Sequence, residues 1–300
     1  MMVLAWLIGC NGCGSTTDTD LVTDTPTDTG PATDTDSKDK KDGNNDSAGS
    51  TGDTADVAIC AGTEACWRFE RATETGEVAD ISGNENTLIL GGQATIAGPG
   101  RPIPGADNQG VLDMDGEPDL ASLTLGGNLA TFAGGLTLEA LALADETTPW
   151  PEDSEGDRIR YVAWFEDDAF SLRLEDDGAG NLQVRARANW NGDGSGDCAV
   201  EATGPISGTE SWCLSATYAD GELLVFVDGV QVGSAEVGGS CTDTGPVTPL
   251  AAGRFHVGAD DTAGDGVAGD RTWRGKLDEL RITAGALEAG SLFCAQGTRR

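Results

Sequence analysis

One stretch of the chain places oxygen-bearing side chains at alternate positions around a glycine. It reads NWNGDGSGD and runs from residue 189 to residue 197. Amide, carboxylate and carbonyl oxygens spaced in this way are the ligands that a calcium-binding loop supplies. Val200 occupies the place of the closing bidentate glutamate, and Glu201 follows one place late. A calcium site is therefore one prediction, and a solvated Gly/Asp loop is the alternative. The predicted ligands are Asn189, Asn191, Asp193, Ser195 and Asp197.

The remaining titratable residues are poor candidates for catalysis. Asp278 and Glu279 are adjacent in a predicted strand, so alternation places them on opposite faces, where they cannot act on one bond. His256 is the only histidine of the chain. A two-histidine metalloprotease motif therefore cannot be built. We expect the His256 ring at an ordinary strand position, either facing solvent or satisfied by its surroundings. These patterns favour a protein that is not an enzyme.

The eight cysteines indicate an oxidising compartment. Cys10 and Cys13 lie near the N-terminus, and the other six lie in the body without paired CxxC motifs. An even number of such cysteines favours disulfides. Six cysteines allow 15 pairings, and we expect Cys294 to return to Cys60 or Cys66. The disulfide candidates are Cys60, Cys66, Cys198, Cys213, Cys241 and Cys294.

The chain begins with an apolar stretch that ends at a cysteine. Residues 1–8 are too few to span a bilayer as a helix but suit the apolar region of a signal peptide. Leu7-Ile8-Gly9-Cys10 resembles the signal box of bacterial lipoproteins, which implies lipidation of Cys10 and a place in the cell envelope. Asn11 after the cysteine points to the outer membrane by the same resemblance. No Lys or Arg precedes the apolar run, which departs from the pattern.

Two other interpretations of the N-terminus remain: an ordinary cleaved signal, and a redox pair of Cys10 and Cys13. The redox pair needs a βαβ context, and a polar tract follows instead. That tract, residues 14–56, is rich in Thr and Asp and has almost no apolar residues. It cannot bury enough surface to offset its ordering entropy, so we expect a disordered linker. The predicted organisation is a signal and lipidation site (1–13), the linker (14–56) and one folded domain (57–300).

The net charge of the chain limits the classes of partner that it is expected to bind. The chain has 300 residues, 51 acidic against 18 basic, and a formal net charge of -33. A protein that binds a phosphate backbone needs the opposite balance, so no nucleic-acid partner is expected. Contact with a membrane is expected through the lipid anchor only. The sequence leaves the oligomeric state open.

The body of the chain has the pattern of an all-β domain. Residues 136–144 (LTLEALALA) alternate strictly, and residues 181–190 alternate Leu, Val and Ala with Gln and Arg. Within residues 222–232, Asp228-Gly229 predicts a two-residue hairpin turn. Short strands separated by Gly and Asp favour a sandwich of two antiparallel sheets. The expected core residues are Trp67, Phe69, Trp212, Phe226, Leu280 and Ile282.

Three blocks of the body resemble laminin-G-like domains of the concanavalin A-like lectin/glucanase superfamily. They are residues 65–90, with an aromatic strand and a DISGNEN turn; residues 210–234, with a Trp strand and VDG; and residues 254–287, with WRGKLDELRI. The resemblance implies a jelly-roll sandwich whose first and last strands are adjacent. The glucanases of this superfamily carry a Glu-x-Asp-x-x-Glu strand, and the chain does not contain it.

The resemblance implies a binding or adhesion module. Its expected partner is a carbohydrate or a surface protein, bound through loops at the sandwich edge or through the concave sheet, with calcium as the candidate cofactor. Two alternatives stay open. The first is a polysaccharide-acting glycoside hydrolase, which would need carboxylates on one face of the concave sheet. The second is a purely structural surface lipoprotein, because this fold hosts many functions.

Overall fold

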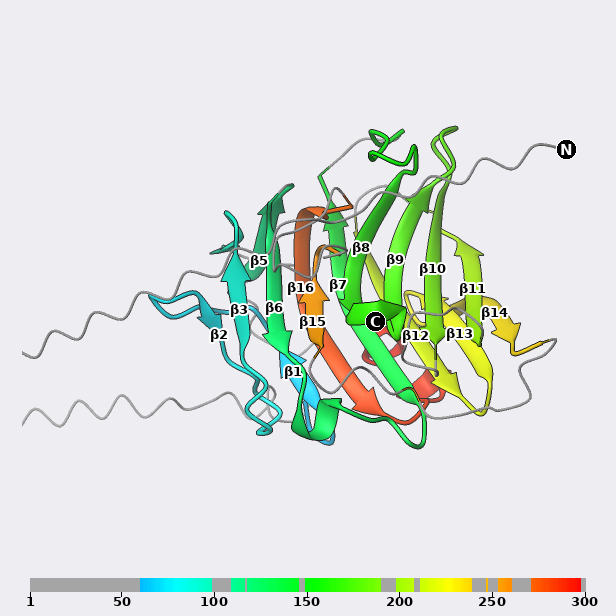
Figure 1. Cartoon of the computed structure of the whole chain (residues 1–300), viewed down its shortest axis with the longest axis horizontal. Coiled ribbons are helices and arrows are strands. Elements are labelled where there is room, and N and C mark those ends of the chain that lie inside the picture. The colour runs from blue at the N-terminus through cyan, green and yellow to red at the C-terminus, as the bar shows by residue number, and fades with distance from the viewer. Residues whose placement is uncertain are drawn as a thin grey trace, which may run out of the picture. The chain divides into compact units, whose positions relative to one another are not determined.

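Two antiparallel sheets of eight strands each form the described part of the protein (Figure 1). The computed structural model describes residues 60–98, 109–116, 118–145, 149–189, 198–207, 211–238, 247, 253–260 and 271–297. The predicted all-β sandwich is confirmed. The adjacency of the terminal strands is also confirmed, because β1 pairs with β16.

The first sheet has the strand order β14-β13-β12-β7-β16-β5-β4, with β1 added beside β16. Its members are β1 (Ala65–Trp67), β4 (Thr95–Ala97), β5 (Val111–Asp115), β7 (Leu136–Ala144), β12 (Ser211–Ala219), β13 (Glu222–Val227), β14 (Val230–Glu236) and β16 (Arg274–Ala284).

The second sheet has the strand order β11-β10-β9-β8-β15-β6-β3-β2. Its members are β2 (Glu77–Val78), β3 (Leu88–Gly91), β6 (Leu120–Thr124), β8 (Ile159–Phe165), β9 (Phe170–Asp176), β10 (Leu182–Asn189), β11 (Ala199–Pro205) and β15 (Arg254–Val257). Three 3-10 helices, η1 (Gly127–Leu129), η2 (Glu166–Asp168) and η3 (Ala289–Ser291), and the short helix α2 (Phe293–Gly297) complete the described elements.

The core lies between the two sheets and is built by alternation along the strands. Leu138, Ala140 and Ala142 of β7 face the core from the first sheet, and Leu172 and Leu174 of β9 face it from the second. All six predicted core residues are at most 1% exposed. Burying an aliphatic or aromatic side chain of this size stabilises the fold by about 1.5–3 kcal/mol.

The turn predicted at Asp228-Gly229 is confirmed. Both residues adopt positive φ, 50° and 77°, as a type I′ turn requires. A Cβ atom on Gly229 would lie 2.6 Å from the Cα atom of Ala295 in α2. Glycine is therefore needed here twice, for its backbone conformation and because the C-terminal helix approaches so closely.

The short helix α2 packs on part of the outer face of the first sheet, against β12. Cys213 forms a disulfide with Cys294, across 81 residues of sequence. The two cysteines form a small apolar cluster with Leu141 and Phe293. The expectation that Cys294 pairs with Cys60 or Cys66 is therefore wrong. The reason is spatial, because α2 packs against β12, which carries Cys213, and because Cys60 and Cys66 pair with each other.

The other described cysteines are also oxidised. Cys60 pairs with Cys66 across six residues. Cys198 is disulfide-bonded as well, and Cys241 lies outside the described residues. The prediction of a disulfide-bearing domain is confirmed.

A buried ion pair lies beneath the C-terminal helix. Glu139 of β7 and Arg281 of β16 form a salt bridge, and the side chain of Glu139 is fully buried. A Glu139 oxygen also accepts a hydrogen bond from the backbone N–H of Phe293 at 2.9 Å. The guanidinium of Arg281 lies 4.3 Å from the ring centroid of Phe293. Burial raises the pKa of Glu139, although Arg281 acts in the opposite direction.

Asp278 and Glu279 lie at an irregularity of β16, so simple alternation does not describe them. The register of β16 with β7 shifts between Asp278 and Arg281, and Glu279 has a φ of 47°. Both carboxylates are fully buried. Glu279 accepts a hydrogen bond from Arg68 Nε at 2.9 Å. The expectation that alternation places the two carboxylates on opposite faces is therefore replaced by the observation that both are buried.

Removing the long-range disulfide should destabilise the domain more than removing the short one. In the chain-entropy account, the 81-residue separation of Cys213 and Cys294 contributes roughly 4.5 kcal/mol, and the six-residue separation of Cys60 and Cys66 roughly 2 kcal/mol. Urea unfolding of the two double-alanine variants measures both effects. Equal losses of unfolding free energy would contradict the expected dependence on loop length.

Glu279 should make stability fall as the pH rises through the weakly acidic range. Burial raises the pKa of Glu279 from its ordinary 4.5 to about 7, although Arg68 opposes the shift. The folded state therefore holds this proton more tightly than the unfolded chain. Its stabilising contribution is complete below pH 4.5 and is lost as the pH rises to about 7, which amounts to about 3 kcal/mol at most.

Urea unfolding of the wild type and of Glu279→Gln between pH 4 and 8 measures this slope. The variant should lose this part of the pH dependence. Glu236→Gln, at an exposed position of β14, is the matched control and should keep it. Parallel profiles for the wild type and Glu279→Gln would contradict the assignment.

Candidate functional site

Outward-facing side chains of four neighbouring strands form a row across the second sheet. Tyr161 of β8 lies opposite Arg173 of β9, which lies opposite Arg185 of β10 and then Thr203 of β11. The alternate residues of these strands fill the core. Alternation along each strand and antiparallel register together place this polar row outside.

A second row runs beside the first. It contains Trp164, Ser171, Arg187 and Glu201, again from β8, β9, β10 and β11. A register shift in β8 between Tyr161 and Ala163 lets Tyr161 and Trp164, three residues apart, contribute to the same face. A bulge of this kind re-aims side chains, and here it places two aromatic rings beside the arginines.

Arg173, Glu175, Arg185 and Glu201 form a closed ring of alternating charge. Arg173 contacts Glu175 at 3.3 Å and Glu201 at 3.1 Å. Arg185 contacts the same two carboxylates at 2.8 Å and 3.3 Å. Partly exposed pairs contribute only about 0.2–1 kcal/mol each, so the ring adds little to folding stability. Its main physical consequence is that four polar side chains are held in fixed orientations.

Two further groups orient this charge ring. The guanidinium of Arg173 lies 5.8 Å from the ring centroid of Tyr161. Burial raises the pKa of Tyr161, which keeps the phenol protonated. Arg271 holds the neighbouring loop by contacting Asp153 at 2.8 Å and Asp157 at 3.3 Å. Burial of Asp153 opposes its ionisation, but the hydrogen bond from Arg271 prevails and lowers the pKa of this carboxyl.

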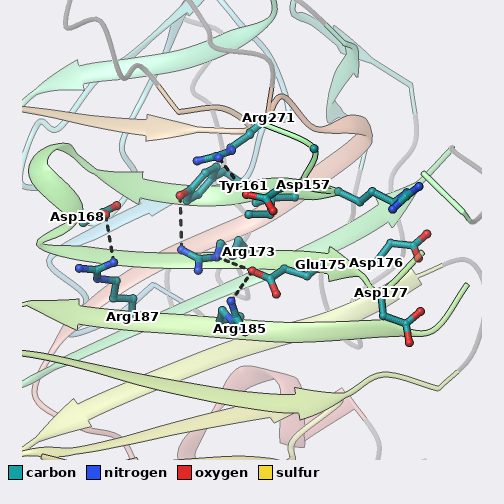
Figure 2. A pocket seen from close by; sticks show the side chains of 13 residues that line it. Asp157, Tyr161, Asp168, Arg173, Glu175, Asp176, Asp177, Arg185, Arg187 and Arg271 are labelled. Atoms are coloured by element: carbon teal, nitrogen blue, oxygen red, sulfur yellow. Dashed lines mark hydrogen bonds and ion pairs between the residues drawn. The ribbon is translucent and has the colours of Figure 1, made fainter. Parts of the chain in front are cut away.

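A cavity of about 430 Å³ lies over these residues. Figure 2 shows the side chains around it, with Arg187 beside Asp168 at one end and Asp176 and Asp177 at the other. Five of the chain's 18 basic residues line it: Arg158, Arg173, Arg185, Arg187 and Arg271. Five acidic residues line it as well: Asp157, Asp168, Glu175, Asp176 and Asp177. The lining is therefore neutral in sum, although the chain is strongly acidic.

The described residues reach only one of the predicted calcium ligands. Asn189 ends β10 and is fully buried. Asn191, Asp193, Ser195 and Asp197 lie outside the described residues. Within the described ranges, no group of three or more His, Cys, Asp or Glu side chains is placed to hold a metal ion.

The predicted lipidation site, Cys10, also lies outside the described residues. The described residues contain no helix with the length and apolar character needed to cross a membrane.

His256 is fully buried in β15, so of the two environments expected for its ring the solvent-facing one is wrong. It lies opposite Trp164 of β8, with the ring centroids 5.2 Å apart. β15 lies between β6 and β8 in the second sheet.

Sequence reasoning missed the cluster of charged side chains on the outer face of the second sheet. This cluster, which we call the charged face, contains Arg173, Glu175, Arg185, Arg187 and Glu201. The alternation of Arg185 and Arg187 in β10 was visible, and Arg173 and Glu175 alternate in β9 in the same way. The signal was a concentration of arginine in two neighbouring strands of a chain that is poor in basic residues. Their charge ring depends on strand register, which the pattern of one strand does not give.

Comparison with solved structures shows where this fold recurs. The binding domain of botulinum neurotoxin serotype G superposes with a TM-score of 0.53 at 8% identity, over 79% of this chain and 51% of that one. The serotype D binding domain gives 0.52 at 9% identity, over 77% and 50%. This chain therefore spans about half the length of the neurotoxin binding domains.

A third structure is matched over almost its whole length. Domain 4 of AbnA, a GH43 extracellular arabinanase from Geobacillus stearothermophilus, was solved in complex with arabinotriose. It superposes with a TM-score of 0.50 at 15% identity, over 79% of this chain and 98% of that one. At these identities the likeness concerns the fold alone.

Sequence comparison assigns the family. No curated protein matches the chain. A family model described as the concanavalin A-like lectin/glucanases superfamily matches residues 123–292, which include β7 to β16 and all the strands of the charged face. The chain belongs to the concanavalin A-like lectin/glucanase superfamily.

Proposed function

We propose that this domain is a binding module that recognises carbohydrate on the outer face of the second sheet. The observation that carries the proposal is the charge ring of Arg173, Glu175, Arg185 and Glu201 beneath the cavity. Sugar hydroxyls both donate and accept hydrogen bonds, and paired guanidinium and carboxylate groups offer both functions in fixed geometry. A cavity of about 430 Å³ lies in the range of small-ligand sites.

The comparisons support a binding role at the level of the fold. AbnA domain 4 was solved with arabinotriose, and the neurotoxin domains are named as binding domains. These are statements about those proteins. For this chain, the proposal of carbohydrate binding rests on its own polar cavity over the outer face of the second sheet.

A glycoside hydrolase of the same superfamily is the weaker candidate. Glu175 and Glu201 do lie on the same face, which such an enzyme requires. However, Arg173 and Arg185 each contact both carboxylates and so occupy the space between them. The two acids of a glycosidase flank the scissile bond, and here guanidinium groups take its place.

Removing one arginine of the charge ring should weaken glycan binding. Arg185→Ala leaves Glu175 and Glu201 with one guanidinium instead of two, so the ring opens. We expect a loss of at least about tenfold in affinity, since a charge-assisted hydrogen bond contributes about 1.5–3 kcal/mol. A glycan array followed by titration calorimetry of the hit measures this.

Lys276→Ala, on β16 of the first sheet, is the control and should bind as the wild type does. The array is run with calcium and again with a chelator, because Asp193 and its neighbours are a proposed calcium loop. A blank array in both conditions would count against carbohydrate as the ligand and in favour of a surface protein or a structural role.

We also propose that the module is anchored in a bacterial cell envelope through a lipid on Cys10. This part rests on the sequence Leu7-Ile8-Gly9-Cys10. Several acyl chains on one cysteine would anchor stably, because each buried methylene contributes about 0.8 kcal/mol.

Metabolic labelling with a fatty acid should tag the protein, and Cys10→Ala should abolish the tag. Cys13→Ala is the matched control, because this second cysteine of the same segment is not the predicted lipidation site. Loss of the label in both variants, or in neither, would overturn the assignment of Cys10.

A further inference from the structure

Four side-chain donors converge on one backbone oxygen near the start of the domain. The carbonyl oxygen of Glu64 lies 2.7 Å from Asn128 Nδ2 and 2.8 Å from Asn86 Nδ2. Asn84 Nδ2 lies 3.1 Å from the same oxygen, and Ser82 Oγ lies 3.4 Å from it. A carbonyl oxygen has two lone pairs, so it does not satisfy four donors at once. Hydrogen bonding alone therefore does not account for this arrangement.

Two carboxylates belong to the same cluster and have no cationic partner. Asn128 Nδ2 lies 2.7 Å from a carboxylate oxygen of Glu64, and Asn86 Nδ2 lies 3.0 Å from Asp80 Oδ2. Within the described part of the chain, neither Glu64 nor Asp80 forms an ion pair with an arginine or a lysine. The cluster therefore carries two negative charges and no positive one.

The asparagines of the cluster can present oxygen in place of nitrogen. Turning a side-chain amide by half a turn exchanges its NH2 group for its carbonyl oxygen and leaves its shape almost unchanged. Asn84 is exposed, and Asn86 and Asn128 are partly exposed, so the displaced NH2 groups reach water. With the amide oxygens turned inward, the backbone oxygen, both carboxylates and the three amides form a set of ligands made of oxygen alone.

The number and spacing of these oxygens fit a calcium ion. Ca²⁺ takes about six to eight oxygen ligands at about 2.3–2.6 Å, which places neighbouring ligands about 2.8–3.4 Å apart. The contacts between the groups of the cluster span 2.7 to 3.1 Å. Distances of this length also suit hydrogen bonds. The surplus of donors over lone pairs and the uncompensated negative charge decide in favour of an ion.

Three separate segments bring the ligands together. A disulfide closes the short loop, residues 60–66, that carries Glu64. The backbone N–H of Cys66 donates to Asp80 Oδ1 at 2.9 Å and so fixes the turn that follows. Asn128 comes from the 3-10 helix η1. An ion at this place would fasten the first strand of the domain to the turn around Asp80 and to η1.

We propose that this cluster is a calcium site that stabilises the N-terminal side of the domain. Its ligands are Glu64, Asp80, Asn84, Asn86 and Asn128. The site shares no residue with the calcium loop predicted at residues 189–197. It also neither uses nor requires the carbohydrate-binding face of the second sheet.

The test measures the binding of calcium alone to the full-length protein after treatment with a chelator. It is made on Asp193→Ala, so that the predicted loop at residues 189–197 does not contribute. Calorimetry should show one calcium ion bound per chain. The Tm should rise with the calcium concentration, because a ligand of the folded state stabilises it by mass action. Mg²⁺ should raise the Tm much less, because it demands a smaller octahedral site.

Terbium luminescence provides a local measurement. Tb³⁺ replaces Ca²⁺ in oxygen sites and emits when a nearby indole is excited. Trp67 Nε1 donates a hydrogen bond to the backbone carbonyl of Asn86 at 2.6 Å, so this indole lies beside the proposed ligands. Emission on excitation of tryptophan is expected in Asp193→Ala, and added calcium should compete it away.

Variants of Asn128 distinguish a metal ligand from a hydrogen-bond donor. Asn128→Asp keeps an oxygen and removes the donor, so it should bind calcium at least as tightly as the parent. Asn128→Ala should lower the calcium affinity at least tenfold. Asn181→Ala is the matched control, because this amide also donates to a carboxylate in a turn, that of Asp177 at 2.8 Å. The control should keep the calcium affinity of the parent.

Several results would overturn the site. One is a Tm that calcium does not change, together with no terbium emission sensitised by tryptophan. Another is an unchanged calcium affinity in folded Asn128→Ala. A folded Asn128→Asp that no longer binds calcium would show that the Asn128 amide acts as a donor and not as a ligand. If Asn128→Asp does not fold, Glu64→Gln takes its place, and an affinity reduced less than tenfold would overturn the proposal.

Discussion

The alternation of side chains across β-strands is the constraint on which the rest of this structure depends. Each strand buries one set of side chains between the sheets and must present the other set outward. In β9 and β10, the buried set is Phe, Leu, Val and Ala, and the outward set contains Arg173, Glu175, Arg185 and Arg187. A shift of one residue in register would bury the arginines, so the core and the charged face specify one another.

The outer faces of the two sheets differ in what lies over them. On the first sheet, the C-terminal helix covers Glu139 and Arg281 and is linked to β12 by the disulfide of Cys213 and Cys294. A buried ion pair is costly unless its remaining donors and acceptors are satisfied, and Phe293 contributes both a backbone N–H and a ring. On the second sheet, the cavity of about 430 Å³ lies over β8, β9 and β10. The first sheet thus has its outer face partly covered by α2, beside a cavity of about 590 Å³, whereas the second sheet carries the charged residues around the other cavity.

The charged face combines local neutrality with a strongly acidic chain. Arginines and carboxylates alternate, so each is paired without a large net field. Such an arrangement contributes little to folding and much to the orientation of its donors and acceptors. Arg187 lies beside this ring and contacts one carboxylate, that of Asp168, at 3.6 Å.

The sequence alone determined the fold class, the hairpin turn at Asp228-Gly229 and the main strands, because alternation and turn chemistry are local properties. The tertiary structure decided the rest. The disulfide of Cys294 and the charge ring join residues that are distant in sequence. The irregularity at Glu279 departs from the geometry of a regular strand. Each depends on which strands become neighbours and in what register, and one strand's pattern does not contain its partner's position.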